Sequence, residues 1–227
     1  MVVRLLSLFA AVIAIAQGGI TACVDQTSLG GNLYLVNQTF QLAKDYVPPD
    51  LVKPAVRSQG SSVTLRREAA EALEALFAAA RESGHTLVAV SGYRSYASQS
   101  AIYHRKVSST GSAEKAGLLV ALPGCSEHQL GLAVDLGRAS STQLNYSFGR
   151  SKEGQWVSEN AHRFGFIVRY RAQWTDITGI AEEPWHLRFV GVPHAMEIKR
   201  LDIPLELYVY QMAQASFGAY FTEGFGG

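Results

Sequence analysis

The chain has 227 residues and a formal net charge of +1; 48% of its residues are hydrophobic and 17% are charged. This composition is typical of a globular domain with a sizeable core, and it excludes a disordered or collagen-like chain. Because the charge is almost balanced, the sequence carries no basic footprint of the kind that binds nucleic acid, and we expect no nucleic-acid partner.

The first 23 residues have the pattern of a secretory signal. Arg4 precedes an apolar run from Leu5 to Ala16, which at about 12 residues is too short to span a membrane. The sequence ITAC at residues 20–23 is similar to a bacterial lipobox, which predicts cleavage after residue 22 and a lipid anchor on Cys23. Ordinary cleavage near Ala22 stays open. In both cases we expect an extracytoplasmic protein, at the bacterial cell surface or in the periplasm.

The remaining chain divides into three parts. Residues 23–32 are short, polar and glycine-containing and predict a tether. Residues 33–210 are expected to form a single domain, and residues 211–227 form a tail to which the sequence assigns no role. The only cysteines are Cys23 and Cys125, so a disulfide framework is excluded.

The apolar pattern predicts helices and strands that are interspersed without a strict repeat. A helix is expected over residues 64–82, where apolar side chains form one stripe and Gly84 follows the end. A strand should follow over 86–91, and a second helix should begin near Ser95 or Tyr96 and run to about Val107. Further elements are a helix at 154–163 and strands at 130–136, 166–170 and 185–190. This order predicts an α+β fold, a single domain with a largely antiparallel central sheet flanked by helices.

The segment SEHQLGLAVDL (126–136) places a carboxylate inside a strand-like run. Its alternation puts Asp135 on one face with Gly131 and Ala133, whose small side chains should leave room above the strand. A buried carboxylate costs several kcal/mol unless a cation, a hydrogen-bond network or a metal ion compensates it. His128 lies seven residues earlier, so a metal ion on this sheet face is one of the open explanations.

The segment EPWH (183–186) supplies the other candidate groups. Three protein ligands and an open position are typical of catalytic zinc, so His128, Asp135 and His186 form a candidate Zn²⁺ site. Glu183 remains as a possible general base. Strict alternation would place Glu183 and His186 on opposite faces, so we expect a turn at Pro184. Trp185 fits either a core position or a contact with substrate.

Three segments together resemble the VanY-type D-alanyl-D-alanine carboxypeptidases, zinc peptidases of bacterial cell-wall peptides. They are SGYRSYASQ (91–99), SEHQLGLAVDL (126–136) and EPWHLRFVG (183–191), and the resemblance extends from about Leu33 to about Tyr208. It implies that His128, Asp135 and His186 bind zinc and that Glu183 is the catalytic base. By the same resemblance Arg94 steadies the developing oxyanion, while Gln99 and Ser126 contact the substrate.

The function implied by this resemblance is that of a zinc carboxypeptidase, which hydrolyses the C-terminal D-alanine bond of peptidoglycan stem peptides. We expect the protein to be a monomer. Two alternatives share the substrate class, an L,D-carboxypeptidase that cuts tetrapeptides and an endopeptidase that cuts cross-links. A third is a non-catalytic cell-wall binding protein on the same scaffold. Glu183 discriminates against this last alternative, because a binding protein has no need of a general base.

Overall fold

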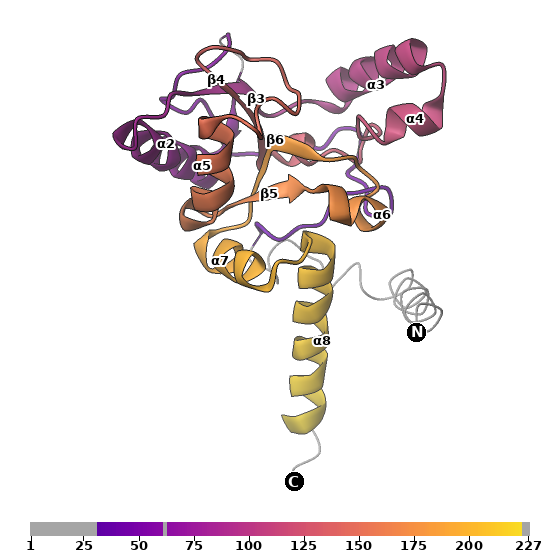
Figure 1. Cartoon of the computed structure of the whole chain (residues 1–227). Helices are drawn as coiled ribbons and strands as arrows, with labels where there is room; N and C mark the ends of the chain where they lie inside the picture. Colours follow the sequence, from indigo (N-terminus) through magenta and orange to yellow (C-terminus); the bar gives the residue numbers. More distant parts are fainter. Residues whose placement is uncertain (1–30, 61–62, 224–227) are drawn as a thin grey trace. The chain divides into compact units, whose positions relative to one another are not determined.

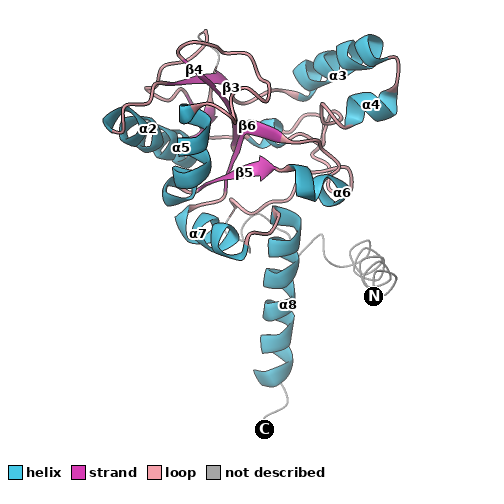
Figure 2. Ribbon diagram, in the orientation of Figure 1, coloured by secondary structure: helices cyan, strands magenta, loops and turns pink. Residues whose placement is uncertain are grey.

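The structure is a computed structural model that describes residues 31–60 and 63–223, with a main compact unit that begins at Leu35. The expected signal segment and Cys23 lie outside the described residues. The central sheet has four antiparallel strands in the order β3-β4-β6-β5 (Figures 1 and 2). These strands are β3 (Leu87–Ser91), β4 (Ala133–Arg138), β6 (Glu183–Phe189) and β5 (Phe166–Tyr170), and a separate pair joins β1 (Leu51–Val52) to β2 (Leu65–Arg66).

Helices surround the sheet, and the expected α+β class is confirmed (Figure 2). Helices α2, α5 and α7 contact β3, β6 and β5, respectively. None of the helices in the described part of the chain is both long and apolar enough to cross a membrane. The helices are α2 (Arg67–Glu82), α3 (Tyr96–Thr110), α4 (Ala113–Gly117), α5 (Lys152–Asn160), α6 (Thr175–Thr178), α7 (Val192–Leu201) and α8 (Leu205–Glu223), with 3-10 helices at Glu127–Leu130, Ala161–Phe164 and Ala172–Trp174.

Several expected elements agree closely with the structure. The strand at 166–170 is found with those bounds, and α3 begins after Ser95, whose hydroxyl accepts a hydrogen bond from the Ser98 N–H at 3.2 Å. Helix α2 begins at Arg67 rather than at residue 64, because Leu65 and Arg66 pair with β1. The domain end expected at residue 210 falls inside α8.

The two faces of the central sheet differ in chemistry. Side chains of directly paired residues in an antiparallel sheet share a face, so the pair Asp135 and His186 lies on one face. Arg188, which pairs with both Ala133 and Ile167, also lies on this face. The opposite face is apolar and buried, with Val134, Leu136, Phe166, Leu187 and Phe189.

The strand that carries Asp135 starts and ends later in the chain than its alternation predicts, at 133–138 instead of 130–136. Residues 127–130 form a 3-10 helix that ends at Gly131, and β4 starts only at Ala133. Gly131 has φ 69°, and a Cβ atom there would approach the side chains of Leu51 and Arg66 to 2.9 and 3.2 Å. The expectation that Gly131 leaves room above Asp135 is therefore wrong, because this glycine serves a left-handed turn and a close contact elsewhere.

Candidate metal centre

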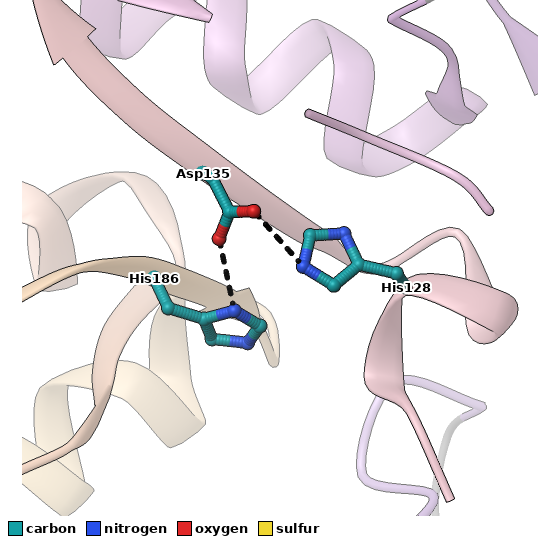
Figure 3. A group of neighbouring side chains, drawn as sticks. All are labelled: His128, Asp135 and His186. Atoms are coloured by element: carbon teal, nitrogen blue, oxygen red, sulfur yellow. Dashed lines mark hydrogen bonds and ion pairs between the residues drawn. The ribbon is translucent and has the colours of Figure 1, made fainter. Parts of the chain in front are cut away.

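His128, Asp135 and His186 come together as the sequence predicts (Figure 3). Nε2 of His128 lies 3.3 Å from Oδ2 of Asp135, and Nδ1 of His186 lies 3.1 Å from Oδ1 of the same carboxylate. The candidate ligand atoms are all within 4.8 Å of one another, and all three residues are buried. Among the described residues, they form a compact set of two nitrogens and one carboxylate.

The backbone fixes each of these side chains by a different route. Asp135 and His186 are paired residues of the two inner strands, β4 and β6, so the sheet register sets their separation. His128 lies on the 3-10 helix that precedes β4, and its Nδ1 is 2.7 Å from the carbonyl oxygen of Gly92. Because a carbonyl oxygen only accepts, Nδ1 of His128 carries a hydrogen, and Nε2 is the ring nitrogen that faces Asp135 and would bind a metal ion.

This donor set fits a zinc ion. Ligand atoms about 2.0–2.1 Å from a tetrahedral zinc are about 3.4 Å from each other. Each histidine is close to this separation from its nearer Asp135 oxygen, 3.3 Å from Oδ2 for His128 and 3.1 Å from Oδ1 for His186. Burial alone would raise the pKa of Asp135, but His128 and His186 outweigh it and hold that pKa well below its usual range. The carboxylate is therefore ionised, as a metal ligand must be.

Glu183 lies at the edge of this group without joining it. Its Oε2 is 3.8 Å from Nδ1 of His186, and its side chain is 18% exposed. No turn occurs at Pro184, contrary to expectation. Instead the pairing of β6 with β5 is irregular, since a single residue, Arg169, lies opposite the three residues 184–186. Burial raises the pKa of Glu183 to about 7, which suits a group that exchanges protons near neutral pH.

Arg94 approaches the centre from the loop between β3 and α3. Its Nη1 lies 3.9 Å from Oδ2 of Asp135 and 3.4 Å from Oγ of Ser91, and its side chain is 23% exposed. Its backbone N–H donates to the carbonyl oxygen of His128 at 3.2 Å, which ties the loop to the metal centre. A partly exposed guanidinium beside the ligands can bind the oxygen of a carbonyl or carboxylate.

A cleft of about 390 Å³ opens over these residues. The candidate ligands, Arg94 and Glu183 lie in one part of its wall, and apolar and aromatic side chains supply much of the rest. Other lining residues include Ile102, Leu119, Val120, Tyr146, Tyr170 and Trp185.

Comparison with known proteins identifies the family. The model of the VanY D-alanyl-D-alanine carboxypeptidase family matches residues 62–192, which is more than half of the chain. This protein belongs to the VanY family.

Relatives and solved structures agree with this assignment. YodJ of Bacillus subtilis is 45% identical over 181 residues, and a D-alanyl-D-alanine carboxypeptidase of Enterococcus faecium is 33% identical over 189 residues. The matches cover 78% and 79% of this chain but only 66% and 57% of those two proteins. The LD-carboxypeptidase LdcB has a TM-score of 0.75 at 44% identity over 81% of this chain and 87% of its own. A zinc complex of a VanY D,D-pentapeptidase has a TM-score of 0.65 at 33% identity, with coverages of 78% and 98%.

The residues expected to contact substrate in a VanY protein occupy different places. Ser126 and Trp185 line the cleft, and the ring of Trp185 lies 6.2 Å from that of Tyr146. Gln99 differs from the expectation, because it is 0% exposed and does not line the cleft. Its Nε2 donates instead to the carbonyl oxygen of Ala121 at 2.7 Å. In this structure Gln99 supports the cleft wall from behind.

The sequence reasoning missed a group of buried charges behind the metal centre. Glu127 lies between Arg169 of β5 and Arg188 of β6, and it also contacts His186. Arg169 in turn reaches Glu206 at the start of α8. A signal was available, because an arginine within each of the largely apolar segments FIVRY (166–170) and HLRFV (186–190) indicates a buried ion pair.

Proposed function

We propose that this protein is a zinc carboxypeptidase that releases the C-terminal D-alanine of peptidoglycan stem peptides. The observation that supports it most is the grouping of His128, Asp135 and His186 in one cleft with Glu183 and Arg94. Membership of the VanY family supplies the substrate class, and the zinc complex of a VanY relative supports the metal.

Each residue would have a separate task in this hydrolysis. Zinc bound to His128, Asp135 and His186 would activate water and polarise the scissile carbonyl. Glu183 would accept the proton of the attacking water at its carboxylate and pass it to the leaving amine, a contribution worth roughly 10²–10⁴ in rate. Arg94 would offer its guanidinium to the charge that develops on the carbonyl oxygen.

The environment of Glu183 argues against a binding protein without catalysis. A carboxylate that lines the cleft beside a proposed zinc ligand, with a pKa raised to about 7 by burial, is placed for proton transfer. Such a group is of little use to a domain that only binds cell wall.

A second candidate concerns the bond that is cut. The D-alanine could be released from a pentapeptide, as in a D,D-carboxypeptidase, or from a tetrapeptide, as in an L,D-carboxypeptidase. The higher identity and TM-score to LdcB, at 44% and 0.75, against 33% and 0.66 to VanYB with D-Ala-D-Ala, favour the tetrapeptide. An endopeptidase would need a cleft that also accommodates the cross-linked peptide on the leaving-group side of the scissile bond.

One experiment separates these functions. Purified protein is analysed for zinc and then incubated with a pentapeptide, a tetrapeptide and a cross-linked dimer, and the products are identified by mass spectrometry. Zinc together with release of free D-alanine supports the proposal, and the substrate consumed fastest assigns the bond. Stoichiometric zinc with no product from any substrate would leave a binding protein as the function.

We further propose that the protein acts outside the cytoplasm as a monomer anchored to the membrane through Cys23. The lipobox-like sequence ITAC supports the anchor. Wild-type protein should partition with membranes and carry lipid, and Cys23→Ser should not. A Cys23→Ser protein that still carries lipid would contradict the anchor, and light scattering at two concentrations would test the monomer.

A further inference from the structure

Glu127 is a buried carboxylate whose two oxygens serve different partners. It is 1% exposed. Its Oε1 accepts from Nε of Arg169 at 2.7 Å and from Nη1 of Arg188 at 2.8 Å. Its Oε2 lies 3.2 Å from Nε2 of His186. One oxygen is thus held by two guanidinium groups, while the other is directed at a candidate zinc ligand.

The charges around Glu127 balance without the metal centre. Arg169 also forms a bidentate hydrogen bond with Glu206 through Nη1 and Nη2. The two positive charges of Arg169 and Arg188 are thus matched by the two negative charges of Glu127 and Glu206. An isolated buried carboxylate would be neutralised, but one between two guanidinium groups stays ionised. An ionised carboxylate is an acceptor only, so the hydrogen between Oε2 and the ring must be on Nε2 of His186.

We propose that Glu127 is a positioning residue that fixes the His186 ring with hydrogen on Nε2, which keeps Nδ1 available for zinc. This inference rests on the proposed zinc site. Nδ1 is the ring nitrogen that faces the ionised carboxylate of Asp135, at 3.1 Å, so without zinc it carries a hydrogen as well, which zinc would displace on binding. If the neutral ring kept its single hydrogen on Nδ1 instead, it would present no lone pair to the metal.

The two histidines are therefore held by hydrogen bonds to different ring nitrogens, so each would present a different nitrogen to the metal. His128 is held at Nδ1 by the carbonyl of Gly92, which leaves Nε2 for the metal. His186 is held at Nε2 by the carboxylate of Glu127, which leaves Nδ1. A carboxylate partner also makes the imidazole more basic than a carbonyl does, and loss of such a partner typically weakens metal binding by about 10–100-fold.

The test compares Glu127→Gln with Glu206→Gln in the full chain. Each variant removes one buried charge from Arg169, but only Glu127→Gln changes the group that faces His186. In Glu127→Gln, the side-chain amide can turn its NH₂ toward Nε2 and favour hydrogen on Nδ1. We expect zinc affinity, measured by competition with a chelator, to fall about 10–100-fold in Glu127→Gln. In Glu206→Gln the zinc affinity should stay within about threefold of wild type, even if the melting temperature falls.

Two results in these variants would contradict the positioning role of Glu127. Zinc affinity in Glu127→Gln within about threefold of wild type, or an equal loss in both variants, would mean that Glu127 only supports the fold. If Glu127→Gln does not fold, nitrogen-15 NMR of zinc-loaded wild-type protein decides. Zinc on Nδ1 and hydrogen on Nε2 of His186 support the inference, and the reverse pattern overturns it. Wild-type protein that binds no zinc would instead defeat the proposed function.

Discussion

The two faces of the central sheet are both buried, yet they are stabilised in different ways. The face with Leu136 and Phe166 consists of apolar side chains, and burying such area is favourable in itself. The face with Asp135, His186 and Arg188 carries buried charged or ionisable groups that would be costly there without partners. The comparison shows that the apolar core and the candidate metal centre lie on opposite faces of one sheet.

The strongest way to break the polar face is to remove a metal ligand. His128→Ala takes away one of the three proposed ligands but leaves the contact between Glu127 and His186 in place. Because catalytic zinc typically contributes several kcal/mol and each 1.36 kcal/mol is tenfold, kcat/KM should fall by about 10³ or more if the proposed function is right. Elemental analysis should show that the variant has lost zinc. Stoichiometric zinc in His128→Ala would mean that the ion binds elsewhere.

A milder change on the polar face should separate chemistry from binding. Glu183→Gln keeps the size of the side chain but cannot accept a proton. We expect kcat to fall by about 10²–10⁴ while zinc content and melting temperature stay near wild type. Arg94→Lys is the companion variant, which keeps the charge and should retain part of the activity. Loss of zinc from Glu183→Gln would make this residue a ligand, and near-normal turnover would place the base elsewhere.

A cavity on the apolar face should reduce stability but leave the catalytic rate almost unchanged. Leu136 is fully buried and lies next to Asp135 in the chain but on the other face of β4. Leu136→Ala should reduce the free energy of unfolding by about 2–5 kcal/mol, as large-to-small core changes do. In urea titrations the midpoint should fall, whereas kcat per zinc-loaded molecule at low temperature should change little. A matching fall in kcat would show that the two faces are coupled.

The smallest expected effect involves an ionisable group outside the charged cluster. Nδ1 of His194 in α7 lies 2.8 Å from the Tyr208 hydroxyl of α8, and burial lowers the pKa of His194. Since protonation is harder in the folded state, its contribution to stability is complete above its ordinary pKa of about 6.5 and declines as the pH falls below it. Between about pH 7 and 5, melting temperature should therefore fall less in His194→Gln than in wild type. Equal falls would contradict this sign.

Much of the site could be predicted because its residues stand in local patterns. His128, Asp135, Glu183 and His186 lie in two short segments, and α2, α3 and β5 follow from apolar periodicity and a serine cap. Glu127 could not be found in this way. It sits beside a ligand in sequence, but its partners lie 42 and 61 residues away, and only the folded sheet brings them together.

Two local errors have the same physical origin. Gly131 looked like part of an alternating strand, although its positive φ ends a 3-10 helix. Pro184 looked like a turn, although β6 continues through it with irregular pairing to β5. Periodicity indicates which residues tend to be buried, but it does not determine how a chain enters a strand or how two strands are matched across a bulge.

The inner position of β4 and β6 in the sheet determines how easily local unfolding can separate Asp135 from His186. Asp135 and His186 belong to strands that have hydrogen-bonded neighbours on both sides, β3 beyond one and β5 beyond the other. Backbone amides in such strands usually exchange with deuterated water only when the domain unfolds as a whole. The two ligands that the sheet supplies would thus remain assembled through local fluctuations. Zinc would then enter and leave through the cleft without any unfolding of β4 and β6.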